Sequence, residues 1–204
     1  MSQVMPVDAI QGMDKFFKMH LINSLSGIKS PCLIGTKSHR GINNLALFNS
    51  VIHLGAAPPL MGFMLRPLTV PRHTYHNILA HRHFTINHVT EEIYRKAHQT
   101  SANYPEQVSE FEACELTPHF SDQIIAPYVA ESPLKIGLQL EETHAIQANG
   151  NTFVVGRIIE VIYPDQVVDD NGHIDLSELS AMGVCGLEDY YTLEKKERLP
   201  YARP

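Results

Sequence analysis

The chain has 204 residues, of which 44% are apolar, and this is enough for one domain with a real hydrophobic core. Charged residues make up 19% and neither Gly nor Pro is abundant, so the composition excludes a disordered or fibrous chain. The net charge of -6 is uneven: residues 1–100 carry 10 Lys and Arg against 4 Asp and Glu, and residues 101–204 carry 6 against 18. A basic half without Lys or Arg runs fits a small anionic ligand better than nucleic acid, although halves of a sequence need not be halves of a structure.

Three widely spaced cysteines, Cys32, Cys114 and Cys185, form no CxxC pair, which argues against a disulfide framework or a cysteine-based zinc site. The N-terminus lacks a basic stretch followed by an apolar run, so no secretory signal is expected. Residues 41–65 contain no Asp, Glu, Lys or Arg, but asparagines and two adjacent prolines interrupt them. We expect two buried strands and a turn there, no membrane partner, and a cytoplasmic location.

Short alternating or β-branched runs predict strands at 32–36, 46–54, 60–65, 83–89, 134–141 and 152–163. The Asn-Gly turn within 147–151 is typical of a tight hairpin. Three short helices are predicted, at 74–80 capped by Thr74, at 91–98 after two acids, and near a capping box of Ser109 and Glu112. Hairpins and short helices, without a strand-helix-strand rhythm or a GxGxxG, predict a mainly β fold: one β-barrel with short helices.

Two segments carry the features of a ligand site. Residues 43–50 are polar at both ends, so their backbone N–H groups and small side chains could meet a planar polar ligand; the alternative is a strand entered through an Asn-rich turn. Farther along, Arg66 ends a strand and Arg72 precedes a helix that begins near Thr74. An arginine fork beside a helix N-terminus suits a phosphomonoester, whereas the alternative is an exposed arginine beside an ordinary capped helix.

Histidines are concentrated in one part of the chain, because six of the 12 lie between residues 73 and 98. A metal site would use His81 and His83 with His76 or His88. No Asp or Glu occurs between Leu65 and Glu91 to complete or orient such a set, so we expect no metal and interpret most of these residues as structural.

The polar loop at 98–105 is a further candidate, since His98 could exchange protons with a ligand near neutral pH. No GxSxG surrounds Ser101, so a hydrolase triad is not indicated. The alternative is an ordinary loop at the end of a helix.

Several motifs in order resemble the flavin reductase-like, FMN-binding split-barrel family. They are NLALFNSV at 44–51, PPL at 58–60, RHTYHNI at 72–78, FTINHV at 84–89, AESP at 130–133 and GLEDYY at 186–191. The resemblance begins at about Ser30, which leaves 1–29 as an N-terminal extension and 30–204 as the family domain. In this family the segment around the third motif usually reads Arg-x-Asp-Thr-x-x-Asn-Ile. When its Thr, Asn and Ile are matched to Thr74, Asn77 and Ile78, His73 stands where the acid is common.

This resemblance implies a homodimer of Greek-key split barrels, each binding one FMN near the dimer interface. The implied flavin contacts are Asn44, Ala46, Leu47, Phe48, Asn49 and Ser50, with Arg66, Arg72, Thr74 and Asn77 around the phosphate. The substrate side would include His98, Thr100, Ser101 and Tyr191, with His98 as a candidate catalytic residue. Tyr190 and Tyr191 would either close the pocket or pack in the dimer contact.

The resemblance also implies an oxidoreductase that transfers hydride from NADH or NADPH to FMN and then passes electrons to an acceptor, for which an acceptor protein is one candidate. The alternative is a flavin-binding module that passes electrons to a partner protein without oxidising pyridine nucleotide. The sequence does not distinguish these two functions.

Overall fold

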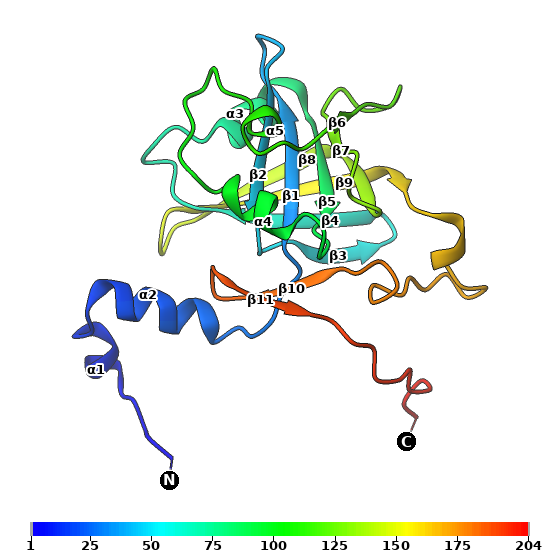
Figure 1. Cartoon of the computed structure of the whole chain (residues 1–204). Coiled ribbons are helices and arrows are strands. Elements are labelled where there is room, and N and C mark those ends of the chain that lie inside the picture. Colours follow the sequence, from blue (N-terminus) through cyan, green and yellow to red (C-terminus); the bar gives the residue numbers. More distant parts are fainter. Residues whose placement is uncertain (1, 204) are drawn as a thin grey trace.

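The computed structural model describes residues 2–203 (Figure 1). Seven antiparallel strands form the main sheet: β1 (Cys32–Lys37), β2 (Asn43–Phe48), β3 (Ile52–Ala56), β4 (Pro59–Leu65), β5 (His83–His88), β8 (Lys135–Ile146) and β9 (Asn151–Ile162). Two small pairs are β6 (Pro118–His119) with β7 (Tyr128–Val129), and β10 (Met182–Cys185) with β11 (Asp189–Thr192). The helices are α1 (Val7–Gln11), α2 (Lys15–Ser24), α3 (His73–His81), α4 (Tyr94–Gln99), α5 (Glu110–Ala113) and the 3-10 turn η1 (Asp165–Val167).

The strand order of the main sheet is β2-β1-β5-β8-β9-β4-β3, so β2 and β3 lie at opposite edges although residues 49–51 alone connect them. Four Cα steps from Phe48 to Ile52 span at most about 15 Å. A flat sheet of seven strands would separate its edge strands by about 29 Å, because neighbouring strands are about 4.8 Å apart. The sheet must therefore roll into a barrel that is split between β2 and β3, and the predicted mainly β split barrel is confirmed.

A single side chain fastens the connection between the two edges. The Ser50 hydroxyl accepts from the Met64 N–H at 3.1 Å and donates to the Met64 carbonyl at 3.2 Å. The register of β3 on β4 begins at Ile52 opposite Gly62, so the hydroxyl replaces the strand partner that Met64 lacks beyond the end of β3. Ser50 thereby attaches the link to β4.

Alternation along the strands divides the apolar residues between two faces. Cys32 and Ile34 of β1 join Phe63 and Phe84 in the cluster that fills the barrel. Leu33, between them, belongs to the cluster that packs under α4 and α5. These short helices therefore cover one outer side of the barrel, next to β2.

Residues 41–65 differ from expectation. The predicted strand at 46–54 is wrong, since the chain breaks between β2 and β3 at the split. The segment holds three strands, and β3 is exposed along most of its length, with Ile52 at 50% and Leu54 at 41%. The absence of charged residues predicted that this segment is buried. However, β3 is an edge strand beside the split, and within residues 2–203 no strand pairs with its outer side.

The helices form without the predicted caps. Arg72 is the N-cap of α3 and its side chain makes no capping bond, while Thr74 lies inside the helix and is buried. The expected capping box is also absent, because the Ser109 side chain makes no capping hydrogen bond at α5. The two acids at 91–92 precede α4 and do not lie in its first turn.

The N-terminal helices and the C-terminal hairpin lie on the same side of the barrel (Figure 1). Lys29 bridges to Val184 of β10, and Asp14 caps α2 by accepting from the N–H groups of Phe16 and Phe17. No residue of α2 is buried. Among residues 2–203, no helix combines the length and apolarity that crossing a bilayer requires.

Candidate functional site

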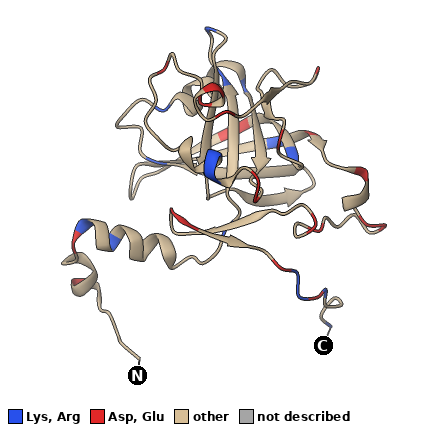
Figure 2. Ribbon diagram, in the orientation of Figure 1, with Lys and Arg blue, Asp and Glu red and all other residues tan. Residues whose placement is uncertain are grey.

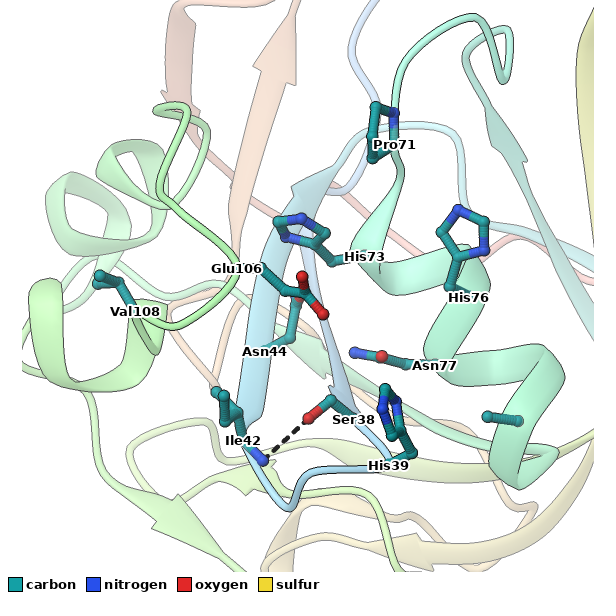
Figure 3. Close-up of a pocket in the computed structure, with 11 residues that line it drawn as sticks. Ser38, His39, Ile42, Asn44, Pro71, His73, His76, Asn77, Glu106 and Val108 are labelled. Carbon is teal, nitrogen blue, oxygen red and sulfur yellow. Dashed lines mark hydrogen bonds between the residues drawn. The ribbon is translucent and has the colours of Figure 1, made fainter.

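A cavity of about 260 Å³ lies where the β1–β2 turn, α3 and the loop at 105–109 meet (Figure 3). It is lined by Ser38, His39, Ile42, Asn44, Pro71, His73, His76, Asn77, Ala80, Glu106 and Val108. Figure 3 shows His73, Glu106 and Asn77 pointing into the same space. Of the residues predicted to contact a flavin, the structure brings Asn44 and Asn77 together here.

Polar groups beside this cavity lack partners within the protein. Asn44 and Asn77 are each only 7% exposed. The Asn77 amide donates to the Thr36 hydroxyl at 3.1 Å. Next to the cavity, the Asn43 Oδ1 and the Arg72 Nε are buried without hydrogen-bond partners in the range 2–203. Leaving a buried polar group unpaired costs about 1–3 kcal/mol, so these groups mark a ligand position.

A buried carboxyl lies beside the same strand. The Glu110 Oε2 accepts from the Leu45 N–H at 2.9 Å, so this N–H points away from β1. Burial raises the pKa of Glu110, while the Leu45 hydrogen bond and the nearby His73 partly oppose that rise. Because backbone groups alternate along an antiparallel strand, the N–H and carbonyl of Leu47 also face outward. The outer edge of β2 can therefore meet a planar polar ligand.

The other end of β2 faces the β10–β11 hairpin. The Asn49 amide donates to the Gly186 carbonyl at 2.7 Å, in the turn of that hairpin. From β11, the Tyr190 hydroxyl lies 3.2 Å from His98 Nδ1, and its ring packs on Tyr94 with a centroid distance of 5.3 Å. Burial raises the pKa of Tyr190 to about 12, so the neutral phenol can donate to the imidazole. At this end of β2, the contacts thus join Asn49 to the β10–β11 hairpin and His98 to Tyr190 of the same hairpin.

The remaining predicted flavin residues have their own contacts. Phe48 stacks edge-on against Phe63 at 4.9 Å in the barrel core, and Leu47 packs into the cluster under α4. Ala46 lies opposite Ile34 on β1. The Arg66 side chain is exposed. Side chains from β2 itself therefore serve largely as core, and its backbone edge remains the surface open to a ligand.

On the predicted substrate side, Thr100 is buried and donates to the Ala97 carbonyl at 2.7 Å, which closes the end of α4. Ser101 is exposed and Tyr191 is 42% exposed. These three residues are not gathered into one site by the contacts of the chain.

Several residues beside the cavity were absent from the sequence prediction, namely Ser38, His39, Ile42, Glu106, Val108 and Glu110. They come from a turn, a loop and a four-residue helix, and no spacing in the sequence joins them. Among residues 2–203, no three His, Cys, Asp or Glu side chains lie close enough together to hold a metal ion. Burial lowers the pKa of His83, and its Nδ1 and the Nε2 of His81 are buried without partners in that range.

Comparison with known proteins assigns the family and the fold. Residues 25–176 match the family model described as flavin reductase like domain. The chain belongs to the flavin reductase-like family. A structure from Shewanella frigidimarina NCIMB 400, described as a flavin reductase with a split-barrel domain, is 46% identical, with a TM-score of 0.95 over 98% of this chain and 100% of that one.

More distant structures share the fold of this flavin reductase-like chain. The FMN-binding protein of Thermus thermophilus is 19% identical, with a TM-score of 0.70 over 85% of this chain and 90% of that one. The NADH:FAD oxidoreductase SgcE6 of Streptomyces globisporus C-1027 is 12% identical, with a TM-score of 0.67 over 90% and 97%. The chain is therefore a flavin-binding protein of the oxidoreductase type.

Proposed function

We propose that this protein binds FMN along the outer edge of β2 and transfers hydride to it from NADH or NADPH. The observation that carries the proposal is the buried Arg72 Nε at the start of α3, which has no acceptor within residues 2–203. The Asn44 side chain, only 7% exposed, lines the cavity beside it. A charged donor without an acceptor fits a phosphate, which accepts charge-assisted hydrogen bonds. Arg72, Thr74 and Asn77 would hold that phosphate, with Arg66 at its exposed side.

The size of the cavity favours a divided site. Its volume of about 260 Å³ is below the roughly 300–1,000 Å³ of pockets that enclose a whole drug-sized ligand. The cavity would therefore hold the ribityl phosphate, while the ring lies outside against the backbone of residues 45–49. Small and apolar side chains at Ala46 and Leu47 would exclude water from that contact.

When bound, FMN supplies the ring that accepts hydride from the pyridine nucleotide and returns electrons to an acceptor. The protein needs to hold two rings in contact, and positioning of this kind can contribute several kcal/mol. The backbone of β2 would orient one ring, and His98 and Tyr190 would border the place of the other. No residue of the chain has to provide an acid or a nucleophile.

Anaerobic titration tests this function. Purified protein reconstituted with FMN should lose its visible absorbance when NADH or NADPH is added. The alternative is a flavin-binding module that exchanges electrons with a partner protein, and it predicts bound FMN that neither nucleotide reduces. Failure of FMN to bind at all would contradict both functions.

We also propose that two copies associate through the region of β3. This strand exposes Ile52 and Leu54 beside the Asn49 end of the flavin edge, and α2 exposes Phe16 and Phe17. Apolar surfaces of this kind are typical of contacts between proteins. Light scattering should give twice the 22.9 kDa of the chain, and a monomer with full FMN occupancy would contradict the dimer.

We place the protein in the cytoplasm, without a nucleic-acid partner. Cys32, Cys114 and Cys185 are free thiols, which suits a reducing compartment. Figure 2 shows Lys and Arg on α2, the barrel and the C-terminal segment, and the net charge of the chain is -6, which disfavours binding to a polyanion. Retention on a heparin column at physiological salt would contradict the proposed lack of a nucleic-acid partner.

A further inference from the structure

The lining of the α3 cavity contains three histidines and one glutamate but no lysine or arginine. Positive charge inside it must therefore come from imidazoles, because Arg72 adjoins the cavity and does not line it. A phosphate with an ionised second oxygen carries close to two negative charges at neutral pH. The balance of charge in this cavity then depends on which histidines are protonated.

His73 is the histidine in the best position to act on a phosphate. It is the first residue of α3, a nine-residue helix whose first N–H groups have no partners within the helix. Its neighbour Arg72 has the buried, unpartnered Nε, and the nine-tenths buried amide of Asn44 lines the same cavity. Figure 3 shows the His73 ring close to Asn44 and directed into the cavity.

A buried carboxyl favours a positive charge at this position. Glu110 is 7% exposed and accepts from the Leu45 N–H, and the nearby His73 partly opposes the rise in the pKa of Glu110 that burial causes. In the motif of the family that the sequence resembles, an acid is common where His73 stands, so this chain has an imidazole where a carboxylate is usual.

We propose that His73 is a specificity-determining residue that, when protonated, contacts the flavin phosphate and makes the preference for FMN over riboflavin depend on pH. The inference rests on the proposed FMN site. Riboflavin lacks the phosphate, so its affinity should not change with the charge of His73. The FMN affinity should pass through a maximum, because it rises as the phosphate loses its second proton near pH 6 and falls as the imidazole loses its own.

Other charged groups face the same region and must be separated from His73. On α3 they are Arg72 and His76, on the β1–β2 turn His39, in the loop Glu106, and on α5 Glu110. Arg72 keeps its charge over the accessible pH range. His76 and His39 also line the cavity and must each be tested alone. His144, an exposed histidine that does not line the cavity, is the matched control.

The test measures dissociation constants of FMN and riboflavin from pH 5.5 to 8.5, by quenching of flavin fluorescence on the full-length apoprotein. Loss of one charge-assisted hydrogen bond weakens binding by about ten- to a hundred-fold. Wild-type affinity for FMN should fall by about tenfold between the maximum and pH 8.5. His73→Asn should bind FMN weakly without this fall, and His73→Lys should bind it strongly up to pH 8.5.

Further variants complete the design. Glu110→Gln keeps an oxygen that can accept from Leu45, and it should move the fall to lower pH because the imidazole loses a carboxylate neighbour. His144→Asn, outside the cavity, should keep the wild-type profile. The inference is overturned if His73→Asn retains the fall, or if His76→Asn or His39→Asn alone removes it. If neither FMN nor riboflavin binds, the proposed function fails as well, whereas tight FMN binding with a flat profile overturns His73 alone.

Discussion

The two ends of β2 use their polar side chains in opposite ways. At the α3 end, the Asn43 Oδ1 and the Arg72 Nε are buried without hydrogen-bond partners within residues 2–203. At the hairpin end, Asn49 is bonded to Gly186, Ser50 to Met64 and His98 to Tyr190. Polar side chains are therefore left without protein partners at one end, whereas they hold the fold together at the other.

This difference shows that the type of a polar residue does not reveal its role, whereas its partner does. A partnered amide has little to gain from a ligand, because a new hydrogen bond would only replace an existing one. A buried donor or acceptor without a partner, such as the Arg72 Nε, gains the full interaction. The comparison predicts that substitutions at the α3 end change ligand affinity, and that those at the hairpin end change stability.

The largest expected effect is on stability, at the hairpin end of β1. His88 lies opposite Cys32, and burial lowers its pKa to about 4. The unfolded chain binds this proton below about pH 6.5, but the folded chain does not until about pH 4, so stability falls as pH falls through this window. The expected loss is about 3 kcal/mol. Urea unfolding at pH 7.5 and 4.5 should show it in the wild type and a smaller loss in His88→Asn.

Removing the charged donor at the α3 end should weaken FMN by about ten- to a hundred-fold. Arg72→Ala deletes the buried, unpartnered Nε, and riboflavin affinity should not change. Arg66→Ala is the matched control, since this arginine is exposed and should contribute less. Calorimetric titration of both flavins measures the effect, and equal losses for FMN and riboflavin would refute a phosphate contact.

A substitution in the link should show the opposite behaviour. Ser50→Ala removes both hydrogen bonds to the Met64 backbone and leaves its N–H and carbonyl without that partner. We expect a loss of about 1–2 kcal/mol in unfolding free energy. FMN affinity at a temperature where the variant is folded should stay within about twofold. A large change in affinity with unchanged stability would place Ser50 in the ligand site.

The smallest effect is expected for His98. His98→Ala loses the contact with Tyr190 but should bind FMN normally and be reduced by pyridine nucleotide only a few-fold more slowly. A general acid or base typically contributes ~10²- to 10⁴-fold, and hydride transfer between aligned rings needs none. Stopped-flow absorbance measures the rate. A thousandfold loss with retained FMN would make His98 a catalytic residue.

Much of the barrel could be predicted from local sequence. Alternating, β-branched runs located β1, β4, β5, β8 and β9, and the Asn-Gly turn correctly placed the hairpin between the last two, where Gly150 has a φ of +74°. The break at 49–51 could not be predicted, because an apolar run continues on both sides and only the split separates it. The helix α2 was missed although Asp14 is a good N-cap, since its apolar residues cover no part of the barrel.

The site was less accessible to sequence reasoning. The order of motifs indicated both the β2 segment and the start of α3, and Asn44 and Asn77 do share a cavity. The contributions of His39, Glu106 and Glu110 depend on a turn, a loop and a short helix that meet only in the folded chain. Nothing in the local sequence shows that the Asn49 side chain is bonded within the protein while the buried Asn43 Oδ1 is not.

The short link between β2 and β3 also has a consequence for the order of folding. The entropy lost on closing a loop grows with the logarithm of its length, so contacts between residues close in sequence form first. The Ser50–Met64 contact spans only 14 residues, whereas Asn87 is bonded to the Leu33 carbonyl across 54. The link between β2 and β3 can thus be attached to β4 before the other strands of the barrel have paired. Strand pairing would then start at the split, and the pairing of β1 with β5 would be a late step.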